Sequence, residues 1–175
     1  MVEFLPIIIP EDLQIEAIEN FDDYHYARKS QSEMPAYKFL YDALREQSGD
    51  NKIVRLHINT TLANGGINDK NTDIHLDPPS GNKYVTTVAS IGAAATIFFN
   101  VDKLKEKAQH GESLFVTNWV RRTTSGLIVP IKKDFAWSYT QAPNGQLVRF
   151  SMREDQHAAA PLPEGTKKIL FTAIV

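Results

Sequence analysis

The fold is decided by the stretch IVRLHIN at residues 53–59, in which apolar and polar residues alternate strictly from Val54 onward. Successive side chains of a β-strand point to opposite faces, so this alternation predicts a half-buried strand with one apolar face. The apolar face carries Val54, Leu56 and Ile58, and the polar face carries Arg55, His57 and Asn59. We expect the apolar face to pack on helices and the polar face to point into the interior of a barrel.

Two helices are predicted before this strand. The first begins at Pro10, carries acidic residues in its first turn and fades near Asn20. The second runs from about Pro35 to Gln47 with an apolar face at helical spacing, and Ser32 is its expected N-cap. The hydrophobic period therefore changes from helical to strand-like close to residue 50.

After residue 59 the sequence predicts short strands separated by turns. The segment 63–71 is a loop by composition, and Ser125-Gly126 and Asn144-Gly145 are typical of hairpin turns. The expected strands lie near residues 72–77, 84–91, 94–100, 113–120, 127–131, 135–139, 147–151 and 168–175. This order predicts a mainly β, α+β single domain over residues 1–175, with helical support in 1–50 and a jelly-roll core in 51–175.

Composition excludes several classes of function. The chain has 175 residues, of which 42% are hydrophobic and 23% charged, which is ordinary for a soluble domain. It has no Cys, so disulfides, zinc fingers, iron–sulfur clusters and thiol nucleophiles are excluded. The net charge of −2 argues against a general nucleic-acid binder. The apolar run 85–99 is too short for a membrane span, and the N-terminus lacks the basic start of a signal peptide, so we expect a cytoplasmic protein.

His75 and Asp77 are the residues that indicate a chemical function. On a strand they would point to the same face, because they are two positions apart. An imidazole and a carboxylate on one face can hold adjacent coordination positions of one metal, and a second His completes a set that leaves other positions open. Of the five His residues, His157 is the best third ligand because it precedes the last predicted strand. Lys167 follows ten residues later, where a buried cation can pair with the carboxylate of a bound acid.

The order and spacing of His75-x-Asp77, His157 and Lys167 resemble the motif of the Fe(II)- and 2-oxoglutarate-dependent dioxygenases. The tail HAAAPLPEGTK, from His157 to Lys167, is similar to the H-x-x-x-P…G-x-R/K tail of the prolyl-hydroxylase-like branch. The run VASIGAAATIFF at residues 88–99 is similar to the strand pair that follows the H-x-D motif in many members. The resemblance covers about residues 53–175, whereas the N-terminal helices match only as generic support.

The resemblance implies a double-stranded β-helix with iron at its open end. By position it assigns His75, Asp77 and His157 to Fe(II). It implies 2-oxoglutarate as a cosubstrate that is decarboxylated by O2, together with hydroxylation or a related oxidation of a C–H bond. We expect a small-molecule substrate, such as an amino acid or a natural-product intermediate, because no separate recognition domain is predicted.

The resemblance also implies contacts to 2-oxoglutarate. Lys167 matches the family residue that binds the far carboxylate, but Lys168 is adjacent and only one of the two can point inward on a strand. Spacing alone favours Lys167. The polar residues that many members carry on the strand before H-x-D have no obvious equivalent here; Asn59 and Thr61 are the nearest candidates, with Arg55 on the same face.

Two other hypotheses remain open from the residues. In the first, the chain is a non-redox, cupin-like jelly-roll module in which His75, Asp77 and His157 are structural or bind a metal without cosubstrate. In the second, the same barrel carries a metal-dependent isomerase or a cofactor-independent dioxygenase. No nucleotide-binding or serine-hydrolase motif is present in the sequence, and no pattern indicates an oligomeric state.

Overall fold

The computed structural model describes residues 2–49, 55–63, 85–92, 96–99, 121–123, 126–128, 139–158 and 164–174. Its helices are α1 (Glu11–Glu19), α2 (Phe21–His25), the short 3-10 helix η1 (Gln31–Glu33) and α3 (Pro35–Ser48). Its strands are β1 (Glu3–Ile8), β2 (Arg55–Leu62), β3 (Val85–Ile91), β4 (Ile97–Phe99), β5 (Arg121–Thr123), β6 (Gly126–Ile128), β7 (Tyr139–Gln141), β8 (Gln146–Ser151), β9 (Gln156–Ala158) and β10 (Lys167–Ile174). The predicted α+β class is confirmed.

Both predicted helices are present, as α1 and α3. Pro35 occupies the first turn of α3, where a missing backbone N–H costs no helical hydrogen bond, and Gly49 follows the helix with a φ of 77°. The N-cap of α3 is Met34, so the prediction of Ser32 is wrong. Ser32 lies inside η1, whose own start is formed by a capping box between Ser30 and Glu33. Within the described ranges, no helix combines the length and the apolar character that crossing a bilayer requires.

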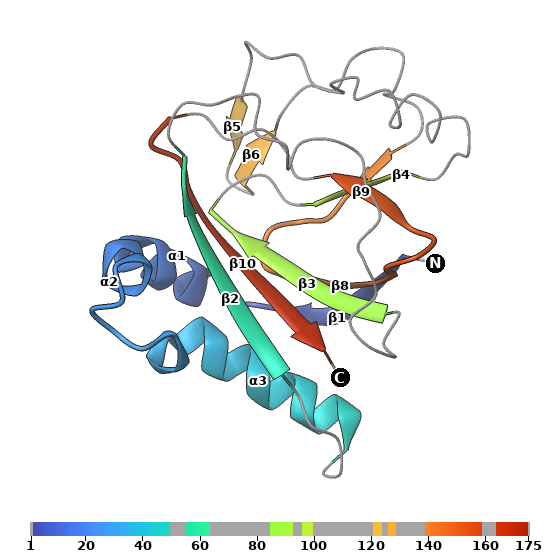
Figure 1. The fold of residues 1–175 in the computed structure, drawn as a ribbon, viewed down its shortest axis with the longest axis horizontal. Coiled ribbons are helices and arrows are strands. Elements are labelled where there is room, and N and C mark those ends of the chain that lie inside the picture. The colour runs from blue at the N-terminus through green and yellow to red at the C-terminus, as the bar shows by residue number, and fades with distance from the viewer. Residues whose placement is uncertain are drawn as a thin grey trace.

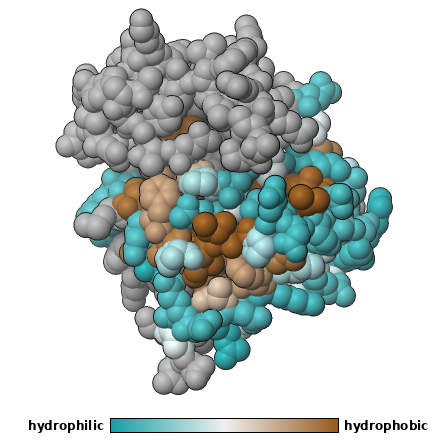
Figure 2. Space-filling view, turned by 180° about the vertical axis from the view of Figure 1, so that it is seen from behind, coloured by the Kyte–Doolittle hydropathy of each residue, from teal (hydrophilic) through white to brown (hydrophobic). Residues whose placement is uncertain are grey.

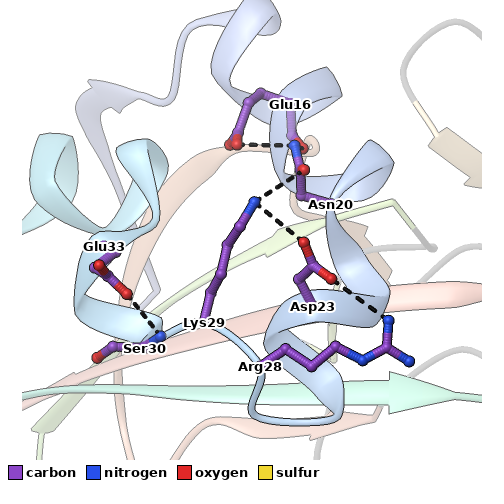
Figure 3. Close-up of polar contacts among 7 residues, drawn as sticks. All are labelled: Glu16, Asn20, Asp23, Arg28, Lys29, Ser30 and Glu33. Carbon is purple, nitrogen blue, oxygen red and sulfur yellow. Dashed lines mark hydrogen bonds and ion pairs between the residues drawn. The ribbon is translucent and has the colours of Figure 1, made fainter.

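Polar side chains fix the corner between α1, α2 and η1 (Figure 3). The Nζ atom of Lys29 lies 3.3 Å from Oδ1 of Asn20 and 3.1 Å from Oδ2 of Asp23. Asp23 also contacts Arg28 at 3.6 Å, and the side-chain amide of Asn20 donates to Glu16 at 3.0 Å. Exposed ion pairs contribute at most about 1 kcal/mol each, so this network sets the path of the chain more than the stability of the fold.

The main sheet has five strands in the order β1-β8-β3-β10-β2, and each neighbouring pair is antiparallel. The three α-helices lie on one face of this sheet, and a smaller sheet of order β7-β4-β9 lies on the other (Figure 1). Strands β5 and β6 form a separate hairpin. Among the described strands, the main sheet is open, with β1 and β2 as its edges.

The main sheet separates two apolar clusters. Between the helices and the sheet, Phe21, Leu40 and Leu44 pack with Ile169 and Phe171, and all five side chains are buried. The half-buried Leu56, Ile58 and Leu62 of β2 join this cluster, which confirms that the apolar face of this strand packs on the helices. Arg55, His57 and Asn59 on its polar face are exposed, so their predicted place in the interior of a barrel is not shown. The other cluster lies between the two sheets and contains Val88, Phe98, Ala142, Val148 and Phe150, with Leu170 packed against it.

A hydrogen bond and an ion pair link helix α2 to strands β2 and β10 of the main sheet. His25 of α2 makes a 3.0 Å hydrogen bond through Nδ1 to the hydroxyl of Thr60 on β2. Asp22 of the same helix pairs with Lys167 on β10 at 3.3 Å. The helical layer therefore contacts both of the strands that carry the predicted cosubstrate residues.

Strand β1 is not predicted by the sequence, because Pro6 interrupts it and its residues do not alternate. Proline lacks the N–H that a central strand needs, but it is tolerated at a sheet edge, where β1 lies.

β1 and the neighbouring α1 carry exposed apolar side chains, including Phe4, Ile8 and Ile15. Figure 2 shows apolar residues gathered in the middle of one face of the molecule, within a hydrophilic surround.

The two predicted hairpin turns have different outcomes. Thr123 of β5 pairs with Gly126 of β6, so a hairpin is confirmed at this place, with Gly126 already in β6 and Ser125 outside the described residues. Asn144-Gly145 also forms a turn, but it joins β7 to β8, which belong to different sheets, so the hairpin predicted there is wrong. Gly145, with a φ of 76°, lets its backbone N–H donate to the carbonyl of Ser90 at 2.8 Å.

Candidate functional site

The two adjacent lysines of β10 point to opposite faces of the main sheet. Lys167 lies on the helix side, where its Nζ atom is 3.3 Å from Oδ2 of Asp22 and 5.4 Å from the centre of the Phe21 ring. Because side chains alternate along a strand, Lys168 shares its face with Leu170, which packs in the cluster between the two sheets. Lys168 is therefore the cation that points into the space between the sheets.

Lys168 is buried, with 6% of its surface exposed. Burial lowers the pKa of its ammonium group to about 8, because the charged form loses its hydration. Among the described residues, no carboxylate lies within ion-pair distance of Lys168, although its neighbour Lys167 has one. A buried cation without an anion is costly, so this position suits an anionic ligand.

The register of β10 with its neighbours places three small polar side chains on the same face of the main sheet as Lys168. Thr61 of β2 is directly opposite Lys168, and residues opposite each other in an antiparallel pair have Cβ atoms about 5 Å apart. Asn59 is opposite Leu170, one step further along the same face. Ser90 of β3 is opposite Leu170 from the other side and is buried. Hydroxyl and amide groups from two strands can therefore complete the hydrogen bonds of an anion held by Lys168.

Arg55 is not brought together with these residues. It is opposite Ile174 at the far end of β2, six residues from Thr61, and its side chain is exposed. At about 3.3 Å per residue, this separation is roughly 20 Å. Of the three β2 residues predicted to contact the cosubstrate, Thr61 lies beside Lys168, Asn59 lies next to it, and Arg55 lies too far along the strand to share a ligand.

His157 is the described member of the predicted metal site. It belongs to β9, is directly opposite Phe98 of β4, and is buried. Its ring centre lies 4.8 Å from that of Phe150 on the main sheet and 6.1 Å from that of Phe98. Contacts to aromatic rings from both sheets place the imidazole between the sheets, on the side of the main sheet to which Lys168 also points.

The hydrogen bond between His157 and Asp155 indicates the tautomer of the imidazole. Its Nδ1 atom lies 3.2 Å from the backbone carbonyl oxygen of Asp155, and a carbonyl can only accept, so Nδ1 carries the hydrogen. In the neutral ring, Nε2 then holds the lone pair that binds a metal. Metal-bound histidines usually donate their other ring N–H to a carbonyl or carboxylate in this way. The chemistry of His157 therefore fits the ligand role that the sequence predicts.

The other two predicted ligands, His75 and Asp77, lie outside the described residues. In the part of the chain that is described, no group of three or more His, Asp or Glu side chains could hold a metal. The role of His75 and Asp77 as iron ligands accordingly remains a prediction from the sequence.

Sequence reasoning did not identify Asp155, which supports His157 through its backbone carbonyl. The only signal was its position two residues before the predicted ligand. That spacing becomes informative only when the structure places Asp155 beside the short strand that contains His157.

Comparisons with family models, with curated proteins and with solved structures find no match. The functional argument therefore depends on the residues of this chain alone.

Proposed function

We propose that the protein is an Fe(II)- and 2-oxoglutarate-dependent oxygenase that hydroxylates, or otherwise oxidises a C–H bond of, a small molecule. His75, Asp77 and His157 would hold the iron, and Lys168, rather than Lys167, would hold the far carboxylate of 2-oxoglutarate. Bound iron, 2-oxoglutarate and O2 together supply the oxidising chemistry. The observation that carries the proposal is the nested pairing of the strands.

A jelly roll is a long antiparallel hairpin of eight strands rolled into two facing sheets. Its first strand pairs with its eighth, its second with its seventh, its third with its sixth and its fourth with its fifth. If the strand predicted at residues 72–77 is counted as the second and the β5–β6 hairpin is left out as an insertion, the first and eighth strands are β2 and β10, the third and sixth are β3 and β8, and the fourth and fifth are β4 and β7. Three of the four nested pairs therefore support the double-stranded β-helix, in which β9 would be the seventh strand.

The register of these pairs predicts which residues would lie opposite His157. The two residue numbers of each partner pair add up to 229 along β2–β10, to 236 along β3–β8 and to 238 along β4–β7. The second-with-seventh pair is nested between the first two of these. If the residue numbers of that pair add up to a total between 229 and 236, His157 would have its second partner between residues 72 and 79. The predicted ligands His75 and Asp77 belong to this segment, which the sequence predicts to be a strand.

The residues of the main sheet would bind and orient the cosubstrate. The ammonium group of Lys168 donates a charge-assisted hydrogen bond to a carboxylate, and the hydroxyl of Thr61 adds a neutral one from the neighbouring strand. Phe98 and Phe150 pack around His157 and exclude water from its ring. A carboxylate held at Lys168 would fix one end of the cosubstrate, and His75, Asp77 and His157 would hold the metal to which its keto-acid end would bind.

The test is an anaerobic titration of the apo-protein with Fe(II) and then with 2-oxoglutarate, followed by visible charge-transfer absorption. We expect the absorption to appear in the wild type and to be lost in His157→Ala and His75→Ala. Lys168→Met should weaken 2-oxoglutarate binding about 30-fold or more, because truncating one partner of a buried charge pair costs at least about 2 kcal/mol. Lys167→Met is the matched control and should bind normally. A folded wild-type protein that binds Fe(II) without acquiring the absorption would refute the proposal.

A non-redox ligand-binding jelly roll is the second candidate. It is favoured by one observation, namely that a buried Lys168 without a carboxylate partner among the described residues suits any carboxylate ligand, with or without a metal. This alternative predicts that 2-oxoglutarate or another carboxylate binds equally well in the presence of a metal chelator. Metal-dependent binding in the same titration excludes it.

A further inference from the structure

The turn that joins β8 to β9 is closed by Asp155. One carboxylate oxygen of Asp155 accepts a 2.7 Å hydrogen bond from the backbone N–H of Ser151, and the backbone N–H of Asp155 donates to the carbonyl of Ser151 at 3.0 Å. Both backbone polar groups of Ser151 are thus bound by the same residue. Hydrogen bonds to an ionised acceptor are stronger than neutral ones, so the Asp155 carboxylate holds this turn firmly.

The closed turn determines where the carbonyl of Asp155 points. That carbonyl oxygen lies 3.2 Å from Nδ1 of His157, at the start of β9. The rings of Phe98 and Phe150 confine the imidazole from two sides. Packing alone restricts the plane of the ring. A rotation by half a turn about the Cβ–Cγ bond keeps that plane but exchanges the positions of Nδ1 and Cδ2. The hydrogen bond to the carbonyl favours the orientation in which Nδ1 faces Asp155.

We propose that Asp155 is a positioning residue, whose carboxylate closes the Ser151–Asp155 turn so that its own carbonyl orients His157 with Nδ1 protonated and Nε2 as the ligand atom. That this orientation strengthens metal binding rests on the proposed function. That Asp155 orients the ring of His157 does not. The carbonyl also makes Nε2 a better electron donor, because a hydrogen-bonded N–H raises the basicity of the opposite nitrogen.

Three variants separate positioning from general support of the fold. Asp155→Ala removes the acceptor of the Ser151 N–H, while Asp155→Asn keeps an amide oxygen that can accept the same hydrogen bond. Glu154→Ala is the matched control, because it removes the neighbouring carboxylate, which is exposed. Thermal unfolding of each variant reports its stability independently of the state of His157.

The first readout is the tautomer of His157 in the apo-protein, measured by long-range 1H–15N NMR under alkaline conditions that keep imidazole neutral. The His157→Ala spectrum identifies the signal. We expect the Nδ1–H tautomer in the wild type, in Asp155→Asn and in Glu154→Ala, and a mixture or the Nε2–H tautomer in Asp155→Ala. An Nε2–H tautomer in the wild type overturns the proposal even if Asp155→Ala fails to fold.

The second readout is Fe(II) affinity under anaerobic conditions. Loss of a residue that orients a metal ligand typically weakens metal binding 10–100-fold, so we expect about that loss in Asp155→Ala, with recovery to within a few-fold in Asp155→Asn. Unchanged tautomer and affinity in a folded Asp155→Ala protein overturns the proposal. If the wild type binds no Fe(II), the proposed function fails, and the tautomer measurement alone decides whether Asp155 positions His157.

Discussion

The two faces of the main sheet differ in what they bury. On the helix face, Ile169, Phe171 and Ala173 of β10 are each at most 1% exposed and pack against other apolar side chains. On the opposite face, the same strand presents Lys168, Leu170 and Thr172, so polar groups alternate with apolar ones. One face is built for close packing, whereas the other accepts the cost of a buried cation.

The difference is sharpest between two neighbouring residues. Lys167 has a carboxylate partner at 3.3 Å and remains partly exposed, as expected for a cation that supports the fold. Lys168 is buried, burial lowers its pKa, and it has no carboxylate partner among the described residues, as the proposed role in binding a carboxylate ligand requires. Perturbed titratable groups inside a protein are candidates for function, and here geometry and electrostatics select the same lysine.

Loss of packing on the helix face should have the largest effect on stability. Phe171→Ala removes a fully buried ring from the larger cluster and should lower the free energy of unfolding by about 3–5 kcal/mol. Leu170→Ala is the control on the other face, where the side chain is half-buried, and it should cost less than half as much. Urea unfolding of both variants measures the difference. Equal losses would mean that the two faces contribute equally to stability.

The buried cation should give stability an unusual dependence on pH. Folding lowers the pKa of Lys168 from 10.5 to about 8, so between these values the unfolded chain keeps a proton that the folded protein has lost. The unfolded state then binds more protons, and stability rises with pH. The free-energy cost of burying the charged ammonium group of Lys168 is fully present below about pH 8 and is absent above about pH 10.5. Relative to Lys168→Met, the wild type should therefore gain about 3 kcal/mol across this window.

Urea unfolding of the wild type and Lys168→Met at several pH values between 7 and 11 tests this expectation. We expect the variant to be the more stable protein at neutral pH and the two to converge as the pH rises. Carboxylate binding should change in the opposite sense, because the ammonium form of Lys168 is lost above pH 8. A constant difference in stability at every pH would show that Lys168 is hydrated in the folded protein.

Much of the helix face could be predicted from the sequence. The alternation of residues 53–59 identified β2, and the helical spacing after Pro35 identified α3, because a burial pattern repeats along each of these elements. β1 and β9 lack such a pattern. β1 contains Pro6 and is an edge strand, and β9 has only three residues, so neither is long enough or regular enough to show a period.

The candidate site was harder to predict, because strand register decides it. Spacing from His157 gave Lys167, but the face on which each lysine lies follows from its partner on β2, which no local pattern shows. Thr61 was identified for its place on the polar face, and the register puts it opposite Lys168. Arg55 is also polar and lies on the same face of β2 as Thr61, yet it is at the other end of the strand and therefore far from Thr61 and Lys168. His75 and Asp77 remain predictions from the motif.

Contact between the helices and the end of β3 offers a narrower test. Gly92 has a φ of 87°, and a β-carbon there would lie 2.5 Å from the carbonyl oxygen of Lys167 and against the side chain of Ile18. Gly92→Ala should therefore lower the free energy of unfolding by at least about 2 kcal/mol. Gly165 also has a positive φ, but a β-carbon added there would meet no atom within 4 Å. Gly165→Ala should cost only about 1 kcal/mol, and an equal loss in both variants would show that backbone conformation alone matters.

The smallest effect is expected at Lys167. Its ion pair with Asp22 joins side chains that are 31% and 52% exposed, and such pairs contribute less than about 1 kcal/mol. Lys167→Met and Asp22→Asn should each cost that little in urea unfolding, and the double variant should cost no more than their sum, because they remove the same contact. Added salt should reduce the loss further by screening the pair. If Lys167→Met instead abolishes 2-oxoglutarate binding while Lys168→Met leaves it intact, then the cosubstrate binds on the helix face, and the division between a packing face and a ligand face is wrong.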